Sequence, residues 1–120
     1  MFISLGHTKL DIYKVTDHLL LECYKLASFF PDEERFNLTS QVRRAAVSVK
    51  LNIAEGSSRR SLLERKRFYE IARGSIVELD TAFEVAIHLG YFSLERSETI
   101  AELLNRCYGM LSKMIGKKEQ

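Results

Sequence analysis

Apolar residues recur at intervals of three and four through four long stretches of this chain, and this spacing limits its fold more than any other feature. The first stretch carries such a stripe at Ile12, Val15, Leu19, Cys23 and Leu26. The spacing places these side chains along one face of an α-helix. One Pro and six Gly among 120 residues leave little turn material for β-structure. The sequence therefore predicts an all-α protein.

Start and stop signals divide the chain into four predicted helices, at residues 9–30, 39–55, 61–89 and 94–116. Thr8 and Ser93 stand where N-caps are expected. Ser61 and Glu64 match a capping box, and Gly56 is predicted to end the second helix in the left-handed conformation. The short connections favour an antiparallel, up-down-up-down four-helix bundle, formed by residues 1–120 as one domain.

The second predicted helix is apolar on two faces. Val42, Val49 and Ile53 share its core stripe, whereas Val47 and Leu51 point almost directly away from it at about 100° per residue. Four helices around one core leave each helix an outer side, so we expect this second face to mediate self-association. A central position in a larger monomeric core is the alternative. The predicted interface residues are Arg44, Val47, Ser48, Leu51, Ala54 and Glu55.

Glycine at position 74 interrupts the third predicted helix. A glycine inside a helix costs about 1 kcal/mol relative to alanine. We therefore expect another group to pack closely against Gly74.

Charge is segregated along the chain although its formal net value is only +2. Residues 43–73 hold nine basic and three acidic residues, and the remainder holds nine basic and thirteen acidic residues. Such a basic tract predicts salt-sensitive, largely sequence-independent binding of nucleic acid, and a symmetric ring would repeat it in every subunit. A solvated face that serves solubility is the alternative. The predicted nucleic-acid-binding residues are Arg43, Lys50, Arg59, Arg60, Arg65, Lys66, Arg67 and Arg73.

Motifs for catalysis or metal binding are missing from the sequence. It has no Glu-x-x-His pair of the ferritin-like di-iron type, no Gly-x-Ser-x-Gly and no glycine-rich phosphate loop. Cys23 and Cys107 form no CxxC motif and fall on apolar helix faces, which indicates reduced core residues. We therefore expect no enzyme activity, no catalytic residue, no metal ligand and no cofactor.

No apolar run approaches the roughly 18 residues that a membrane span requires. The first residues lack the basic and apolar regions of a signal peptide. We therefore expect no membrane association and a cytoplasmic location.

Two motifs carry a family resemblance, QVRRAAVSV at 41–49 and NIAEG at 52–56. Together they resemble the signature of four-helix-bundle proteins encoded in intervening sequences of bacterial 23S ribosomal RNA genes. Residues 64–69 and ARGS at 72–75 resemble that family's third helix, and residues 10–13 resemble its opening, where Trp is more usual than Tyr13. The residues that match the family's polar positions are Arg43, Arg44, Asn52, Glu55 and Arg60.

The resemblance implies a bundle that assembles as a homopentameric ring, and it carries a ribosomal-protein-like label. A related branch, the accessory variability determinants of diversity-generating retroelements, binds reverse transcriptase and nucleic acid through a basic surface. Two hypotheses follow. The chain is an oligomeric, non-enzymatic accessory protein that binds RNA or other nucleic acid at the corner between its second and third helices, in association with ribosomal RNA or the ribosome. Alternatively, it is a scaffold that docks an acidic protein partner or a reverse transcriptase.

Overall fold

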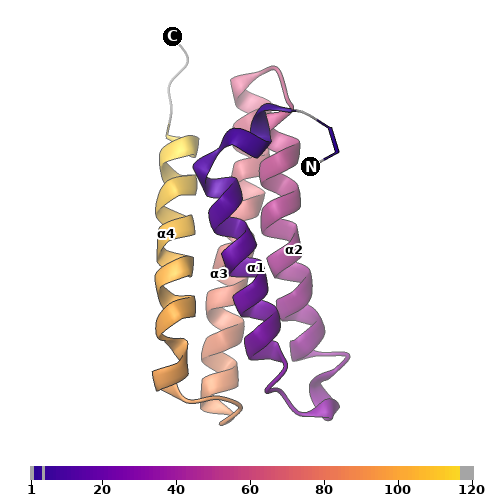
Figure 1. The fold of residues 1–120 in the computed structure, drawn as a ribbon, viewed down its shortest axis with the longest axis vertical. Coiled ribbons are helices and arrows are strands. Elements are labelled where there is room, and N and C mark those ends of the chain that lie inside the picture. The colour runs from indigo at the N-terminus through magenta and orange to yellow at the C-terminus, as the bar shows by residue number, and fades with distance from the viewer. Residues whose placement is uncertain (1, 4, 117–120) are drawn as a thin grey trace.

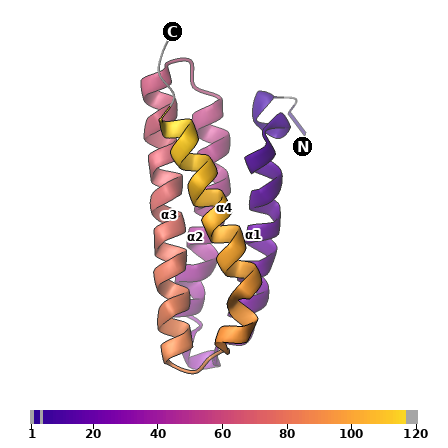
Figure 2. The ribbon, with the colours of Figure 1, turned by 90° about the vertical axis from the view of Figure 1, so that its left-hand side faces the viewer.

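The computed structural model describes residues 2–3 and 5–116, and within them the chain forms α-helices and short 3-10 helices without any strand. The α-helices are α1 (Asp11–Ala27), α2 (Leu38–Ser57), α3 (Leu62–His88) and α4 (Glu98–Ile115). They lie side by side in a bundle 48 Å long (Figures 1 and 2). The predicted all-α class is confirmed. Residues 1, 4 and 117–120 of the predicted domain lie outside the described residues.

Each helix contacts two neighbours around a common core. Helix α2 packs between α1 and α3, and α4 packs against α3 and α1. In Figure 1 the connections from α1 to α2 and from α3 to α4 lie at one end of the bundle, and the connection from α2 to α3 lies at the other. None of the described helices is both long and apolar enough to cross a membrane.

The predicted core stripes of α1 and α2 are buried, which confirms the helical periodicity. On α3 the buried face differs from the stripe that helical periodicity predicts, which is Phe68, Ala72, Ser75, Leu79, Ala82, Phe83 and Ala86. Tyr69 and Ile76 are buried although the predicted stripe omitted them, whereas Phe68 and Ala82 are half-buried. The difference arises because α3 contacts both α2 and α4, so the positions of both neighbours decide which of its side chains are buried.

Glycine 74 lies inside α3 without a close neighbour. It is exposed, and a Cβ added there would meet no atom within 4 Å. The expectation that another part of the chain packs closely against Gly74 is therefore wrong.

Helix starts differ from the predictions at two of three caps. Thr8 is not an N-cap, because it lies within a 3-10 helix (Gly6–Lys9) and donates its hydroxyl to the Leu5 carbonyl oxygen at 2.9 Å. Ser93 is not the N-cap of α4, because a further 3-10 helix (Leu94–Ser97) lies between it and α4. Only Ser61 caps as predicted, accepting a hydrogen bond from the Glu64 amide at 3.0 Å. The 3-10 turns satisfy backbone groups that a side-chain cap would otherwise bond.

Glycine 56 does not end α2 in the left-handed conformation, and that prediction is wrong. Gly56 lies within α2 and is buried against α3. A Cβ at this position would lie 2.9 Å from Phe68 Cβ and 2.9 Å from Tyr69 Cε1. The glycine is therefore required because the two helices approach closely. Among the described residues, the one with a left-handed backbone is Gly90 after α3, whose φ is 78°.

Replacement of Gly56 tests this close approach. We expect Gly56→Ala to lower the free energy of unfolding by about 1–3 kcal/mol, because the added methyl group overpacks the contact. Gly109→Ala is the matched control in α4, where an added Cβ meets no atom within 4 Å, and it should raise stability by up to about 1 kcal/mol. Urea unfolding followed by circular dichroism measures both. Equal stability of the two variants would contradict the close approach.

Candidate nucleic-acid interface and assembly surface

A dense group of cations surrounds the connection from α2 to α3. Residues 58–67 hold five basic residues and one acidic residue. The side chains of Arg60, Arg65 and Arg67 are exposed, and those of Arg59 and Lys66 are half-buried. We call these five residues the basic corner. The structure thus brings together five of the eight residues predicted to bind nucleic acid.

The side chain of Arg59 is held by contacts with its neighbours on α2 and α3. Its Nη2 lies 3.2 Å from Glu55 Oε1, and its guanidinium carbon lies 5.0 Å from the centroid of the Phe68 ring. Its carbonyl oxygen accepts a hydrogen bond from Arg65 Nε at 2.6 Å. These contacts shape the connection, although an exposed pair such as Glu55–Arg59 stabilises little by itself.

The remaining cations of the basic corner are not neutralised. Among the described residues, Arg60, Lys66 and Arg67 form no ion pair. Each can therefore approach a phosphate without first breaking an internal bond.

Lys50 and Arg73 lie outside the basic corner and bond to other helices. Lys50 Nζ pairs with the Asp17 carboxylate and donates to the Tyr13 carbonyl oxygen at 3.3 Å, which ties α2 to α1. Arg73 Nη1 donates to Ser112 Oγ at 3.1 Å, which ties α3 to α4. In this structure both side chains serve contacts between helices.

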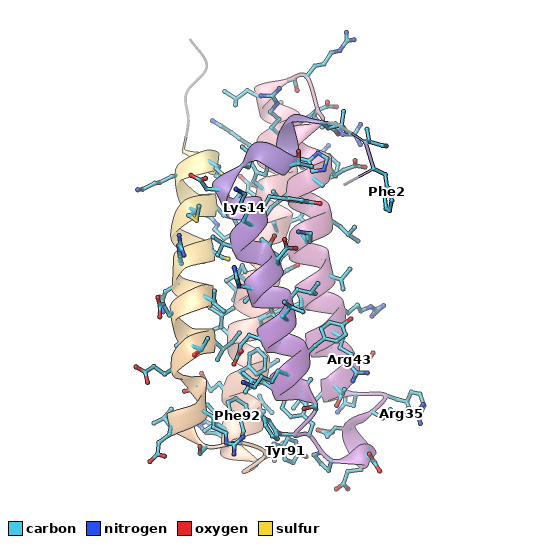
Figure 3. All side chains as sticks on the ribbon, viewed as in Figure 1. Phe2, Lys14, Arg35, Arg43, Tyr91 and Phe92 are labelled. Carbon is cyan, nitrogen blue, oxygen red and sulfur yellow. The ribbon has the colours of Figure 1, made fainter. Side chains whose placement is uncertain are left out.

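Arg43 is separated from the basic corner along α2. It lies fourteen residues before the end of that helix, which corresponds to about 21 Å. Its guanidinium carbon lies 5.4 Å from the centroid of the Tyr24 ring on α1. Figure 3 shows Arg43 in the same half of the bundle as Arg35, away from the connection between α2 and α3. The eight predicted residues therefore do not form one surface.

Acidic residues gather at the opposite end of the bundle from the basic corner. The connection between α1 and α2, residues 28–37, holds three acidic residues and one basic residue. Because this connection and the basic corner lie at different ends (Figure 1), the charge segregation runs along the bundle axis. A field of this shape attracts a polyanion to the basic end and repels it from the other.

A cavity of about 470 Å³ opens beside the basic corner, between the start of α1 and the ends of α2 and α4. Arg65 and Lys113 line it together with Asp11 and several apolar side chains. At its edge the hydroxyls of Ser57 and Tyr69 lie 2.9 Å apart and share a hydrogen bond. Lys113 thus adds a cation to this end of the bundle, a placement that the sequence analysis missed because Lys113 lies on the fourth helix.

The outer face of α2 carries the second apolar stripe. Leu51 is 63% exposed, and Val47 and Arg44 are also exposed. An open groove of about 620 Å³ lies along this face, and we call this groove the α2 groove. The residues that line it are Tyr24, Arg35, Phe36, Ser40, Arg43, Arg44, Val47, Ser48, Leu51 and Asn52. The lining contains three arginines and no acidic residue, and the sequence analysis missed the contributions of Arg35 and Phe36.

The other predicted interface residues differ in their surroundings. Ala54 is half-buried, and Glu55 is exposed and paired with Arg59. Ser48 is half-buried on the side of α2 that faces α3. Its hydroxyl accepts hydrogen bonds from Ser75 Oγ at 3.0 Å and from Asn52 Nδ2 at 3.1 Å.

The two cysteines are buried in the core, as predicted. Burial raises the pKa of the Cys23 thiol to about 12 and that of Cys107 to about 11. Both thiols are therefore protonated and poorly nucleophilic at neutral pH. The described residues contain no group of three or more side chains that could hold a metal ion.

Comparisons with known proteins agree on the fold. A family model described as 23S rRNA-intervening sequence protein matches residues 8–113. A crystal structure of a protein of unknown function from the S23 ribosomal protein family of Bacteroides thetaiotaomicron is similar, with a TM-score of 0.80 and 20% sequence identity. The alignment covers 88% of this chain and 99% of that chain. The comparison with curated proteins finds no match.

Thiol alkylation tests the burial of Cys23 and Cys107. At pH 8 we expect iodoacetamide to modify the native protein at least tenfold more slowly than the protein in urea, because the raised pKa values keep both thiols neutral. Since these pKa values are raised on folding, their contribution to stability is present below pH 9 and is lost as the pH rises through about 11 to 12. Equal rates in the two states would contradict the buried placement.

Proposed function

The chain belongs to the 23S rRNA-intervening sequence protein family, and we propose that it is a self-associating, non-enzymatic accessory protein that binds RNA through its basic corner. The observation that carries the proposal is the trio Arg60, Lys66 and Arg67, which form no ion pair within the described residues and lie at the end opposite the acidic connection. This role belongs in the cytoplasm, in association with ribosomal RNA or the ribosome.

Binding at the basic corner is electrostatic and largely independent of base sequence. Arginine guanidinium groups form bidentate hydrogen bonds with phosphate oxygens. Each neutralised phosphate also releases counterions. Arg59 and Arg65 are bonded to the connection itself, so they hold its shape while Arg60 and Arg67 reach outward. The affinity of a single corner for RNA is modest and falls steeply with salt.

Self-association through the outer face of α2 raises this affinity. Leu51 is 63% exposed and Val47 is 36% exposed, and a second copy would remove these apolar side chains from water. The proposed assembly is a ring of up-down-up-down, antiparallel bundles, pentameric by family resemblance, which gathers the basic corners on one rim. The positions of the connections in Figure 1 favour this order. Several corners that engage one RNA bind with avidity.

A second candidate function is a scaffold that docks an acidic protein segment or a reverse transcriptase. The observation that favours it is the cavity of about 470 Å³ beside Arg65 and Lys113. The residues that line this cavity are largely apolar. Phosphate recognition does not require an apolar lining, whereas an apolar side chain of a protein partner would fill such a cavity. Pull-down from native lysate with and without nuclease distinguishes the two functions, because only a protein partner survives the nuclease.

Neutralisation of the basic corner tests RNA binding. We expect the double variant Arg60→Gln, Arg67→Gln to bind single-stranded RNA more weakly, with the slope of log K against log salt reduced by about 1.4, or about 0.7 for each lost phosphate contact. Fluorescence anisotropy across a salt titration measures the slope. The double variant Lys25→Gln, Arg106→Gln removes the same charge from exposed sites on other helices and should bind like the wild type. Indistinguishable slopes for the two variants would contradict the proposal.

A charge placed on the outer face of α2 tests self-association. We expect Leu51→Asp to reduce the mass measured by sedimentation velocity, because a buried carboxylate without a partner opposes assembly. Since Leu51 is 63% exposed in the single chain, the variant should keep its helical circular dichroism. A wild-type protein that sediments as a monomer at all concentrations would refute the self-association.

A further inference from the structure

All four α-helices contribute side chains to the cavity of about 470 Å³ beside the basic corner. Gly6 and Leu10, which precede α1, form a further part of its wall. The volume lies within the range of about 300–1,000 Å³ that is typical of small-molecule sites. At about 30 Å³ each, the volume of a water molecule in the liquid, about 15 non-hydrogen atoms would fill it. The cavity is therefore large enough to hold a small molecule.

Most of the wall of this cavity is apolar. Ile12 and Tyr69 are buried, and the other apolar side chains of the wall are half-buried. Methionine side chains adapt to the shape of a ligand because they are unbranched and rotate about three bonds. A ligand with an apolar body would cover this wall and remove its half-buried side chains from water. The apolar residues of the wall are Leu10, Ile12, Leu62, Tyr69, Met110 and Met114.

Three charged residues line the same cavity. Asp11 comes from α1, Arg65 from α3 and Lys113 from α4. Among the described residues, none of the three forms an ion pair. Their formal charges leave an excess of one positive charge, which a ligand with a single negative charge would balance. A dianion such as a phosphate monoester would exceed it. The lining is therefore complementary to a monoanion.

The guanidinium group of Arg65 is already held in place. Its Nε donates to the Arg59 carbonyl oxygen at 2.6 Å, and within the described residues its two Nη groups donate no hydrogen bond. Two Nη groups of one guanidinium match the two oxygens of a carboxylate. Because the group is fixed before the ligand arrives, binding a carboxylate there costs less conformational entropy.

The hydroxyl groups at the edge of the cavity do not compete for a carboxylate. Ser57 Oγ donates to the Ile53 carbonyl oxygen at 2.8 Å, so it accepts the proton of the Tyr69 hydroxyl, 2.9 Å away. Both hydroxyl protons are thus used within the protein. Arg65 and Lys113 are the groups of the lining that remain to hold an anionic group.

We propose that this cavity binds a small amphipathic monoanion, an aliphatic carboxylate with a chain of about ten to twelve carbon atoms. The carboxylate binds Arg65 and Lys113, and the chain packs against Met110 and Met114. This inference goes beyond the RNA binding proposed above, and it depends neither on that binding nor on self-association. The ligand would occupy the space that the second candidate function gives to a side chain of a protein partner.

Decanoate is the probe that tests the proposal. By isothermal titration calorimetry we expect decanoate to bind with a dissociation constant below about 1 mM, whereas acetate, which has the carboxylate without the chain, should not bind in this range. In NMR spectra of protein labelled at its methionine methyl groups, the signals of Met110 and Met114 should shift in step with the calorimetric saturation. Decanoate that shows no saturable binding, or that saturates without moving either signal, overturns the proposal.

Charge variants test where the carboxylate lies. We expect Lys113→Gln to weaken decanoate binding about tenfold, because it removes an attracting charge, and Asp11→Asn to strengthen binding, because it removes a repelling one. Lys25→Gln is the matched control, since Lys25 is exposed and lies about 21 Å from Asp11 along α1. This control should bind decanoate like the wild type, and all three variants should be as helical as the wild type by circular dichroism. Equal affinities of Lys113→Gln and Lys25→Gln overturn the placement of the carboxylate.

Discussion

The close approach of α2 and α3 is the contact on which the other features depend. Gly56 lets α3 lie against α2 where a side chain would collide with Phe68 and Tyr69, and the Ser48 and Ser75 hydroxyls bond across the same seam. With its inner side fixed to α3 and α1, α2 must turn its second apolar stripe outward. The same contact keeps the connection between α2 and α3 short, so its arginines and those of the first turns of α3 crowd into one corner.

The consequence of this packing is a bundle with a basic end and an acidic end. In a single chain the basic corner is small, and three cations free of ion pairs within the described residues would bind RNA only weakly. The proposed self-association would change its effect, because a ring with one orientation would repeat each corner on the same rim. The proposed RNA binding and the proposed assembly are therefore linked through the geometry of α2, although a separate set of variants tests each.

The sequence predicted local features well and contacts between helices poorly. The stripes of α1 and α2 and the Ser61 cap depend on residues three or four apart, and the structure confirms them. The predicted caps Thr8 and Ser93 were wrong because 3-10 turns precede α1 and α4. The partners of Lys50 and Arg73 depend on which helices adjoin, which periodicity does not reveal. The same limit explains Lys113, which joins the basic end only because α4 ends there, and Gly56, whose role is set by two side chains on another helix.

The central claim is that the outer face of α2 is covered in the assembled protein. Hydroxyl-radical footprinting of the wild type over a dilution series measures this most directly, by the oxidation rate of Leu51 relative to that of Leu94, a strongly exposed leucine next to α4. The account predicts that Leu51 is protected at high concentration and reaches the rate expected for a 63% exposed side chain on dilution. A ratio that stays constant at all concentrations, with Leu51 fully reactive, would contradict it.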